Sequence, residues 1–236
     1  MKTDEKTVLA SAVYDTLKER IMDQRYPPGE RLNIDALAAD QALSPTPVRE
    51  ALVRLSAERL VTFEPYKGYR VSPLLTFQQV VDLMHVRRLL EVDAARLAAR
   101  RIRRPELYAM EQVVCESAQA EVGSWAHGYR HFNQLDQHFH EILLTAADNR
   151  FLLEAHRSLN VHVELGRFYR VFAEMDQKQT CDEHAAIYGA LQAHEPAGAV
   201  AAVEIHLSAA EDRILHFFGQ QAMRPASNGS QNEGIL

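Results

Sequence analysis

Apolar and polar positions in the first third of the chain predict several short elements. Apolar residues recur at helical spacing from Val8 to Ile21, until the Tyr26–Gly29 segment, which contains two prolines and a glycine, ends the pattern. A short helical segment begins at Ile34, and a longer helix is predicted over about 46–59. Ser44 directly precedes that helix and is a suitable N-cap residue. The prolines that follow it fall in the first turn, where a missing backbone N–H costs the helix little stability.

Two β-biased stretches follow these helices. Leu60–Phe63 and Tyr69–Val71 are separated by a short segment that contains proline and glycine, which predicts a small hairpin. Three short helices followed by a hairpin is the element order of a winged helix-turn-helix. In such a domain the third helix enters the major groove of DNA and the hairpin reaches the phosphates or the minor groove.

The composition and the spacing of apolar residues change after Pro73. Long segments rich in Ala, Leu, Arg and Glu begin there, and no further strand is predicted. Six helices are expected, over 76–103, 105–122, 125–146, 149–174, 176–194 and 196–222. The fold class is therefore mainly α, with an N-terminal winged helix-turn-helix and a C-terminal six-helix antiparallel bundle. We expect a DNA-binding domain at 1–75, a helical domain at 76–224, and a disordered tail at 225–236.

Charge and histidine are unevenly distributed along the chain. The formal net charge is −6, which excludes nucleic-acid binding through bulk charge alone. Residues 1–75 hold 11 basic and 11 acidic side chains, whereas all 11 histidines lie at or beyond His85. Two cysteines without a CxxC spacing, no apolar leader and no long apolar run predict a cytoplasmic protein without a membrane partner.

The N-terminal motifs resemble the DNA-binding domain of GntR-family bacterial transcription regulators. The resemblance rests on the segments 28–32, 43–55, 60–61 and 65–71, which read PGERL, LSPTPVREALVRL, LV and PYKGYRV. It implies DNA contacts from a set of residues in the third helix, the segment before it and the wing: Arg31, Ser44, Thr46, Pro47, Arg49, Lys67 and Gly68. Pro45 stands where the family usually has arginine, which removes a reader of guanine and predicts a different operator.

Polar side chains on the apolar faces of the bundle helices predict a second site. Asp136 and His140 are four residues apart, so their side chains meet at the edge of an apolar face. His184 and His206 each lie among apolar residues of other helices. Taken singly, each fits a hydrogen-bonded core histidine. Taken together, the four can converge from three helices as an Asp-His₃ metal site.

The bundle motifs also resemble a known pattern, the FCD effector-binding domain of the FadR branch of GntR regulators. The matching segments are VRRLLE at 86–91, AARLAA at 94–99, DxxxH at 136–140, DNRFL at 148–152, EH at 183–184 and HL at 206–207. The resemblance implies that Asp136, His140, His184 and His206 bind a divalent metal, with zinc the first choice and nickel or manganese also admissible. It makes Arg87 a candidate clamp for an effector carboxylate and argues against an acyl-CoA effector.

These observations predict a homodimeric transcription regulator that binds a two-fold symmetric operator and is controlled by a small carboxylate effector. The alternative from another class is an enzyme that uses the Asp-His₃ metal, but the sequence offers no second catalytic group beside the ligands. A metal sensor, or a metal with a purely structural role, is the remaining alternative.

Overall fold

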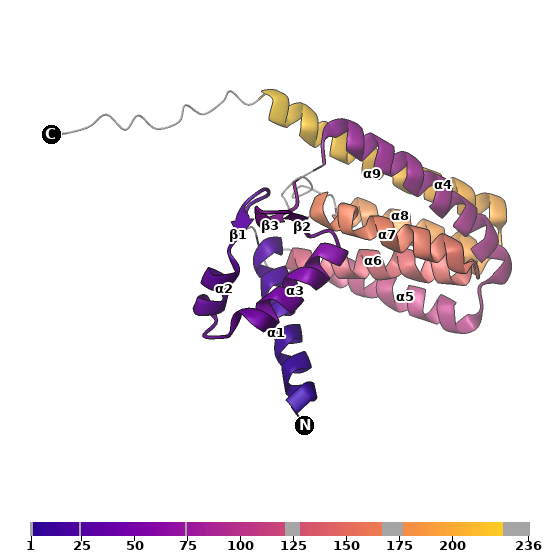
Figure 1. Ribbon diagram of the computed structural model, residues 1–236. Helices are drawn as coiled ribbons and strands as arrows, with labels where there is room; N and C mark the ends of the chain where they lie inside the picture. Colours follow the sequence, from indigo (N-terminus) through magenta and orange to yellow (C-terminus); the bar gives the residue numbers. More distant parts are fainter. Residues whose placement is uncertain (1, 24, 74, 121–127, 167–176, 224–236) are drawn as a thin grey trace.

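The computed structural model describes residues 2–23, 25–73, 75–120, 128–166 and 177–223 of the chain. The described residues form a small head of helices and strands, followed by a bundle of long helices (Figure 1). The predicted fold class, a winged helix-turn-helix and a helical bundle, is confirmed. The predicted tail at 225–236 lies outside the described residues.

In the described part of the N-terminal region, three helices form the head: α1 (Lys2–Met22), α2 (Ile34–Asp40) and α3 (Pro45–Ala57). The apolar positions that gave the helical spacing in the sequence are the ones that pack, since Leu17 and Ile21 of α1 and Leu52 and Leu55 of α3 are fully buried. Burial of these side chains holds α3 across α1 and fixes which face of α3 remains in solvent.

A three-stranded antiparallel sheet completes the head, with the strand order β1-β3-β2. The predicted hairpin consists of β2 (Val61–Glu64) and β3 (Gly68–Val71), and Gly68 adopts the positive φ of 84° that its turn requires. β1 (Arg31–Leu32) was not predicted; it pairs with β3, so that Arg31 lies opposite Arg70.

Within the residues that the structure describes, six helices form the bundle, as the sequence predicts. They are α4 (Phe77–Arg101), α5 (Arg104–Gln119), α6 (Gly128–Ala146), α7 (Arg150–Gly166), α8 (Gln177–Gln192) and α9 (Pro196–Met223). A capping box starts α4, because Thr76 accepts a hydrogen bond from the backbone of Gln79 while the Gln79 side chain accepts one from the backbone of Thr76.

Small residues line the buried face of α4, with Ala94, Ala95, Ala98 and Ala99 all fully buried. They allow α4 to lie close beside α9 along the bundle (Figure 1). Helices α6 and α8 lie next to this pair, so that the inner faces of α4, α6, α8 and α9 meet in the interior of the bundle. None of the helices in the described part of the chain is long and apolar enough to cross a membrane.

Candidate functional site

The N-terminal end of α3 presents part of the predicted DNA-contacting set to solvent. Ser44 is the N-cap residue and makes no capping hydrogen bond with its side chain, and Thr46 and Arg49 are also exposed. Pro47 differs from the prediction, because it is buried inside the head. Its ring therefore supports the packing of the first turn of α3, and a direct DNA contact from this side chain is not supported.

The wing brings further basic residues to the surface of the head. Lys67 lies in the turn between β2 and β3 with its side chain 67% exposed, and its Nζ lies 2.9 Å from Glu64 Oε2. Hydrogen bonding to Lys67 lowers the pKa of Glu64, which is therefore ionised at neutral pH. Arg31 is exposed on β1, and Arg70, opposite it on β3, donates to the carbonyl of Gly29.

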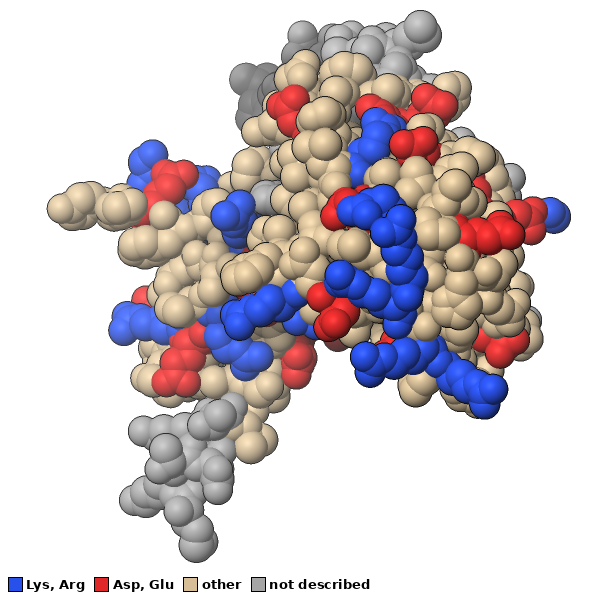
Figure 2. All heavy atoms as spheres, turned by 90° about the vertical axis from the view of Figure 1, so that its right-hand side faces the viewer, with Lys and Arg blue, Asp and Glu red and all other residues tan. Residues whose placement is uncertain are grey.

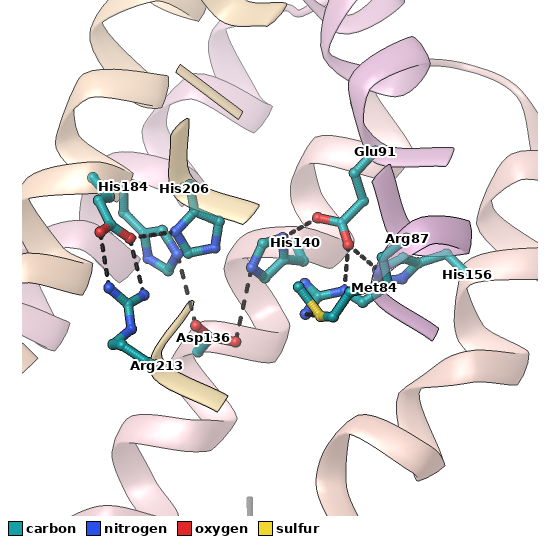
Figure 3. Close-up of polar contacts among 10 residues, drawn as sticks. Met84, Arg87, Glu91, Asp136, His140, His156, His184, His206 and Arg213 are labelled. Atoms are coloured by element: carbon teal, nitrogen blue, oxygen red, sulfur yellow. Dashed lines mark hydrogen bonds and ion pairs between the residues drawn. The ribbon is translucent and has the colours of Figure 1, made fainter. Parts of the chain in front are cut away.

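The three predicted histidine ligands converge inside the bundle, as Figure 3 shows. Ring nitrogens of His140, His184 and His206 lie within 4.8 Å of one another, and all three side chains are buried. Asp136 lies beside them, with its carboxylate oxygens 3.8 Å from His140 Nε2 and 3.7 Å from His184 Nε2. The structure thus brings together the four residues that the sequence singled out, from α6, α8 and α9.

Glu91, a fully buried residue of α4, connects this cluster to two further side chains. Its carboxylate lies 2.7 Å from His140 Nδ1, 2.7 Å from Arg87 Nε and 3.1 Å from His156 Nε2. Burial by itself raises the pKa of Glu91, but the charges of Arg87 and His140 outweigh it and hold that pKa well below its usual range. The ionised carboxylate favours the proton of His140 on Nδ1, which leaves Nε2 as a possible ligand atom.

A second carboxylate positions His206 in the same way. Glu183 Oε2 lies 2.8 Å from His206 Nδ1, and both oxygens of Glu183 accept hydrogen bonds from Arg213. Burial raises the pKa of Glu183, but the hydrogen bonds from His206 and Arg213 bring it below its ordinary value. Burial also lowers the pKa of His206, which favours the neutral ring that a metal requires.

The donor set fits a divalent metal ion. Within the described residues, Nε2 of His206 is buried and makes no hydrogen bond, although buried polar atoms are almost always paired. Three imidazole nitrogens and a carboxylate, with carboxylates behind two of the imidazoles, form a set that suits zinc, nickel or manganese.

Arg87 lies in a setting that the sequence did not predict. Its side chain is 4% exposed, and its Nε donates to Glu91 at 2.7 Å, while Nη1 lies 4.0 Å from the sulfur of Met84. From the sequence we expected an unpaired guanidinium that is available to bind an effector carboxylate. In the structure Arg87 already neutralises a buried carboxylate of its own helix, one turn away.

Comparisons with known proteins agree with both halves of the structure. Residues 9–71 match the gntR family of bacterial regulatory proteins, and residues 82–209 match the FCD domain. The chain belongs to the FCD branch of the GntR family. All the predicted DNA-contacting residues of the head fall within the first match, and all four proposed metal ligands, together with Arg87 and Glu91, fall within the second.

Relatives of this GntR-family chain are transcriptional regulators. It is 32% identical over 188 residues to the Nta operon transcriptional regulator of Aminobacter aminovorans, covering 80% of this chain and 86% of that protein. It is 30% identical over 214 residues to a probable D-xylose utilization operon transcriptional repressor of Paenarthrobacter nicotinovorans, covering 91% and 92%. The E. coli McbR/YncC structure shares the fold, with a TM-score of 0.69 at 22% identity over 90% of this chain and 98% of that one.

The family identifies the chain as a DNA-binding transcriptional regulator and not an enzyme. The enzyme alternative raised by the Asp-His₃ set therefore falls. The recognised function also accounts for the exposed basic start of α3 in the head, since this half of the chain matches the DNA-binding part of the family.

The sequence did not single out four residues of this buried network, namely Glu91, His156, Glu183 and Arg213. Two of them left a signal. Glu91 is four residues after Arg87, which places the pair on one helical face, and Glu183 directly precedes His184. His156 and Arg213 left none, because each meets its carboxylate across a pair of helices.

Proposed function

We propose that this GntR-family regulator is a homodimer whose FCD domain holds one divalent metal ion, and that a small carboxylic acid bound at that ion changes its affinity for a two-fold operator. The observation that carries the proposal is the buried convergence of His140, His184 and His206 beside Asp136. A metal held by these four residues keeps one or two coordination positions for an effector oxygen.

Exposed apolar side chains support the homodimer. Val86 and Leu89 on α4 are 39% and 62% exposed, and Ile205 on the neighbouring α9 is 65% exposed. Large apolar side chains on adjacent helices are typical of a surface that another subunit covers. A second copy of the chain would place two winged heads on one DNA molecule, as a two-fold operator requires.

Arg87 retains a role toward the effector in this proposal. Its Nε is committed to Glu91, but a guanidinium carries further donors on its two Nη atoms. Those donors can hold an effector carboxylate, while Glu91 keeps the guanidinium oriented and holds His140 at the same time. An effector that binds Arg87 therefore also affects Glu91, the carboxylate that positions the proposed metal ligand His140.

The test of the effector proposal is operator binding by wild-type protein and the Arg87→Lys variant, each with and without zinc and a panel of small carboxylic acids. Lysine keeps the positive charge beside Glu91 and loses the planar fork. We expect an active acid to change operator affinity about 5- to 150-fold in zinc-loaded wild type, and to lose most of this effect in the variant and without metal.

An unliganded Arg87→Lys protein should bind the operator as wild type does, which separates loss of response from loss of folding. Should every acid in the panel leave the operator affinity of zinc-loaded wild type unchanged, the effector proposal would be wrong. A variant that responds normally would instead remove Arg87 from the effector site.

The DNA-contacting set leads to a separate expectation. Arg49→Ala should weaken specific binding by about 1–3 kcal/mol, because its exposed guanidinium lies in the first turns of α3, where base edges come within reach. The measurement is affinity at fixed salt for an operator selected from random DNA by the wild-type protein. The folded state should be unaffected, since Arg49 is exposed.

Two further variants serve as controls for Arg49. Arg54→Ala removes the same charge from the same helix, but Arg54 stacks on the Tyr14 ring at 4.1 Å, so its loss should affect operator choice little. Lys67→Ala should weaken binding to all sequences alike and reduce the salt slope by about one. Operator affinity that is equal in Arg49→Ala and wild type would remove α3 as the reading helix.

A further inference from the structure

Three polar side chains inside the bundle lack a hydrogen-bond partner among the residues that the structure describes. They are Ser117 on α5, Asn133 on α6 and Thr180 on α8, with exposures of 1%, 2% and 0%. Both the oxygen and the nitrogen of the Asn133 amide are buried and unbonded, as are the hydroxyls of the other two. Buried polar groups are rarely left in this state, because desolvation without a partner is costly.

Ser117 and Thr180 occupy positions that packing alone would fill with apolar residues. Ser117 continues the buried stripe of α5 after Met110 and Val113. Thr180 begins the buried stripe of α8 that includes Ile187 and Leu191. Alanine or valine would pack at these positions without the cost of an unpaired hydroxyl, so the polar choice points to a bound group.

Two contacts between the helices place the three side chains at one level of the bundle. Glu116, the neighbour of Ser117, pairs with His131 at 3.1 Å, which aligns this part of α5 with the start of α6, where Asn133 lies. Gln177, one turn before Thr180, donates to the carbonyl of Ser117 at 2.8 Å, which aligns α5 with the start of α8. We call Ser117, Asn133 and Thr180 the polar layer.

The polar layer adjoins the proposed metal ligands along two helices. Asn133 precedes Asp136 by three residues and Thr180 precedes His184 by four, so each shares a helical face with a ligand one turn away. One turn of helix is about 5.4 Å, which corresponds to roughly four carbon–carbon bonds of an extended chain. A molecule with one end at the metal can therefore reach the polar layer with atoms several carbons away.

We propose that the polar layer binds hydroxyl groups of the effector, and that the effector is a polyhydroxylated acid of about five or six carbons whose carboxylate lies at the metal. This inference rests on the proposed function. The layer is uncharged, so it suits neutral hydroxyls and offers no cation to a second carboxylate. The Asn133 amide supplies a donor and an acceptor, and the Ser117 and Thr180 hydroxyls supply either.

The experiment measures binding of acids to zinc-loaded full-length protein by titration calorimetry. The probes are aldonic and uronic acids of five and six carbons, with hexanoate and adipate as matched chains without hydroxyls. At least one polyhydroxylated acid should bind about 100-fold more tightly than hexanoate, since a site built for hydroxyls discriminates strongly against analogues that lack them.

Two near-isosteric variants then test the layer itself. Thr180→Val and Asn133→Leu should each weaken binding of that acid about tenfold, with hexanoate affinity and zinc content unchanged. Both variants should also raise the melting temperature of the zinc-loaded protein without acid, because an apolar side chain replaces an unpaired buried one. Thr145→Val, at an exposed position of α6, is the matched control and should change neither quantity.

The remaining outcomes identify which proposal fails. Hexanoate or adipate that binds as tightly as the best polyhydroxylated acid would overturn the role of the polar layer and leave the metal and effector proposal intact. Unchanged acid affinity in Thr180→Val and Asn133→Leu, together with lower melting temperatures, would show that the layer holds structural water instead. If none of the acids binds zinc-loaded wild type, the effector proposal and this inference both fail.

Discussion

Replacing Arg87 by alanine is expected to lower the free energy of unfolding by about 3–5 kcal/mol. The guanidinium of Arg87 pairs with the carboxylate of Glu91, which has no exposed surface. The variant would leave the negative charge of Glu91 buried without its arginine partner. From the sequence, Arg87 was only a candidate clamp for an effector carboxylate, with no part in holding the fold together. The ion pair changes that expectation, and chemical denaturation of zinc-loaded protein measures it.

Arg88→Ala provides the comparison for this prediction. Arg88 is the next residue of α4 and pairs with Glu211 at 2.9 Å, but its side chain is 33% exposed, so its loss should cost about 1 kcal/mol or less. The double variant Arg87→Met with Glu91→Gln should recover part of the stability lost in Arg87→Ala, because no uncompensated charge remains. Equal unfolding free energies for Arg87→Ala and Arg88→Ala would contradict the ion-pair argument.

The second large effect concerns the metal. Purified protein should carry about one divalent ion per chain, and chelation should lower the melting temperature, because an ion that binds only the folded state stabilises it by about 4 kcal/mol at a thousandfold excess over its Kd. His206→Ala should have the same effect without chelator, since it removes a buried ligand and leaves Glu183 with Arg213 alone.

His138→Ala is the control for this prediction. It removes a histidine from α6 at an exposed position, two residues before His140, and should change neither metal content nor melting temperature. Protein purified without chelator that contains no metal, and takes up none of zinc, nickel or manganese, would show that the cluster is a hydrogen-bonded core and not a metal site.

The sequence predicted most of the fold because its elements are local. Apolar spacing and the N-cap position of Ser44 are encoded within a few residues of the elements they mark, although the Ser44 side chain makes no capping hydrogen bond. β1 escaped prediction because two residues carry no periodicity, and Arg31–Leu32 is a strand only through its pairing with β3, almost forty residues later.

The candidate site was predicted in part for the same reason. The spacing of Asp136 and His140 on one helix is visible in the sequence. His156, in contrast, contacts Glu91 from a position 65 residues later in the chain, with two helices between them in sequence. A single sequence carries no record of such distant contacts. Arg87 shows the opposite error: the side chain was recognised, and its partner Glu91, four residues away, was passed over because it was taken as part of a motif.

The pairing of β1 with β3 has a consequence for how a signal can reach DNA. β1 leads directly into α2 through Asn33, which caps that helix. The backbone hydrogen bonds between β1 and β3 therefore connect the hairpin to the helix-turn-helix. An event in the bundle therefore cannot tilt the hairpin without carrying the reading helix along. We expect each head to move as a single piece. In the proposed homodimer, regulation then alters the distance and angle between two intact heads, and operators with altered half-site spacing should reveal it.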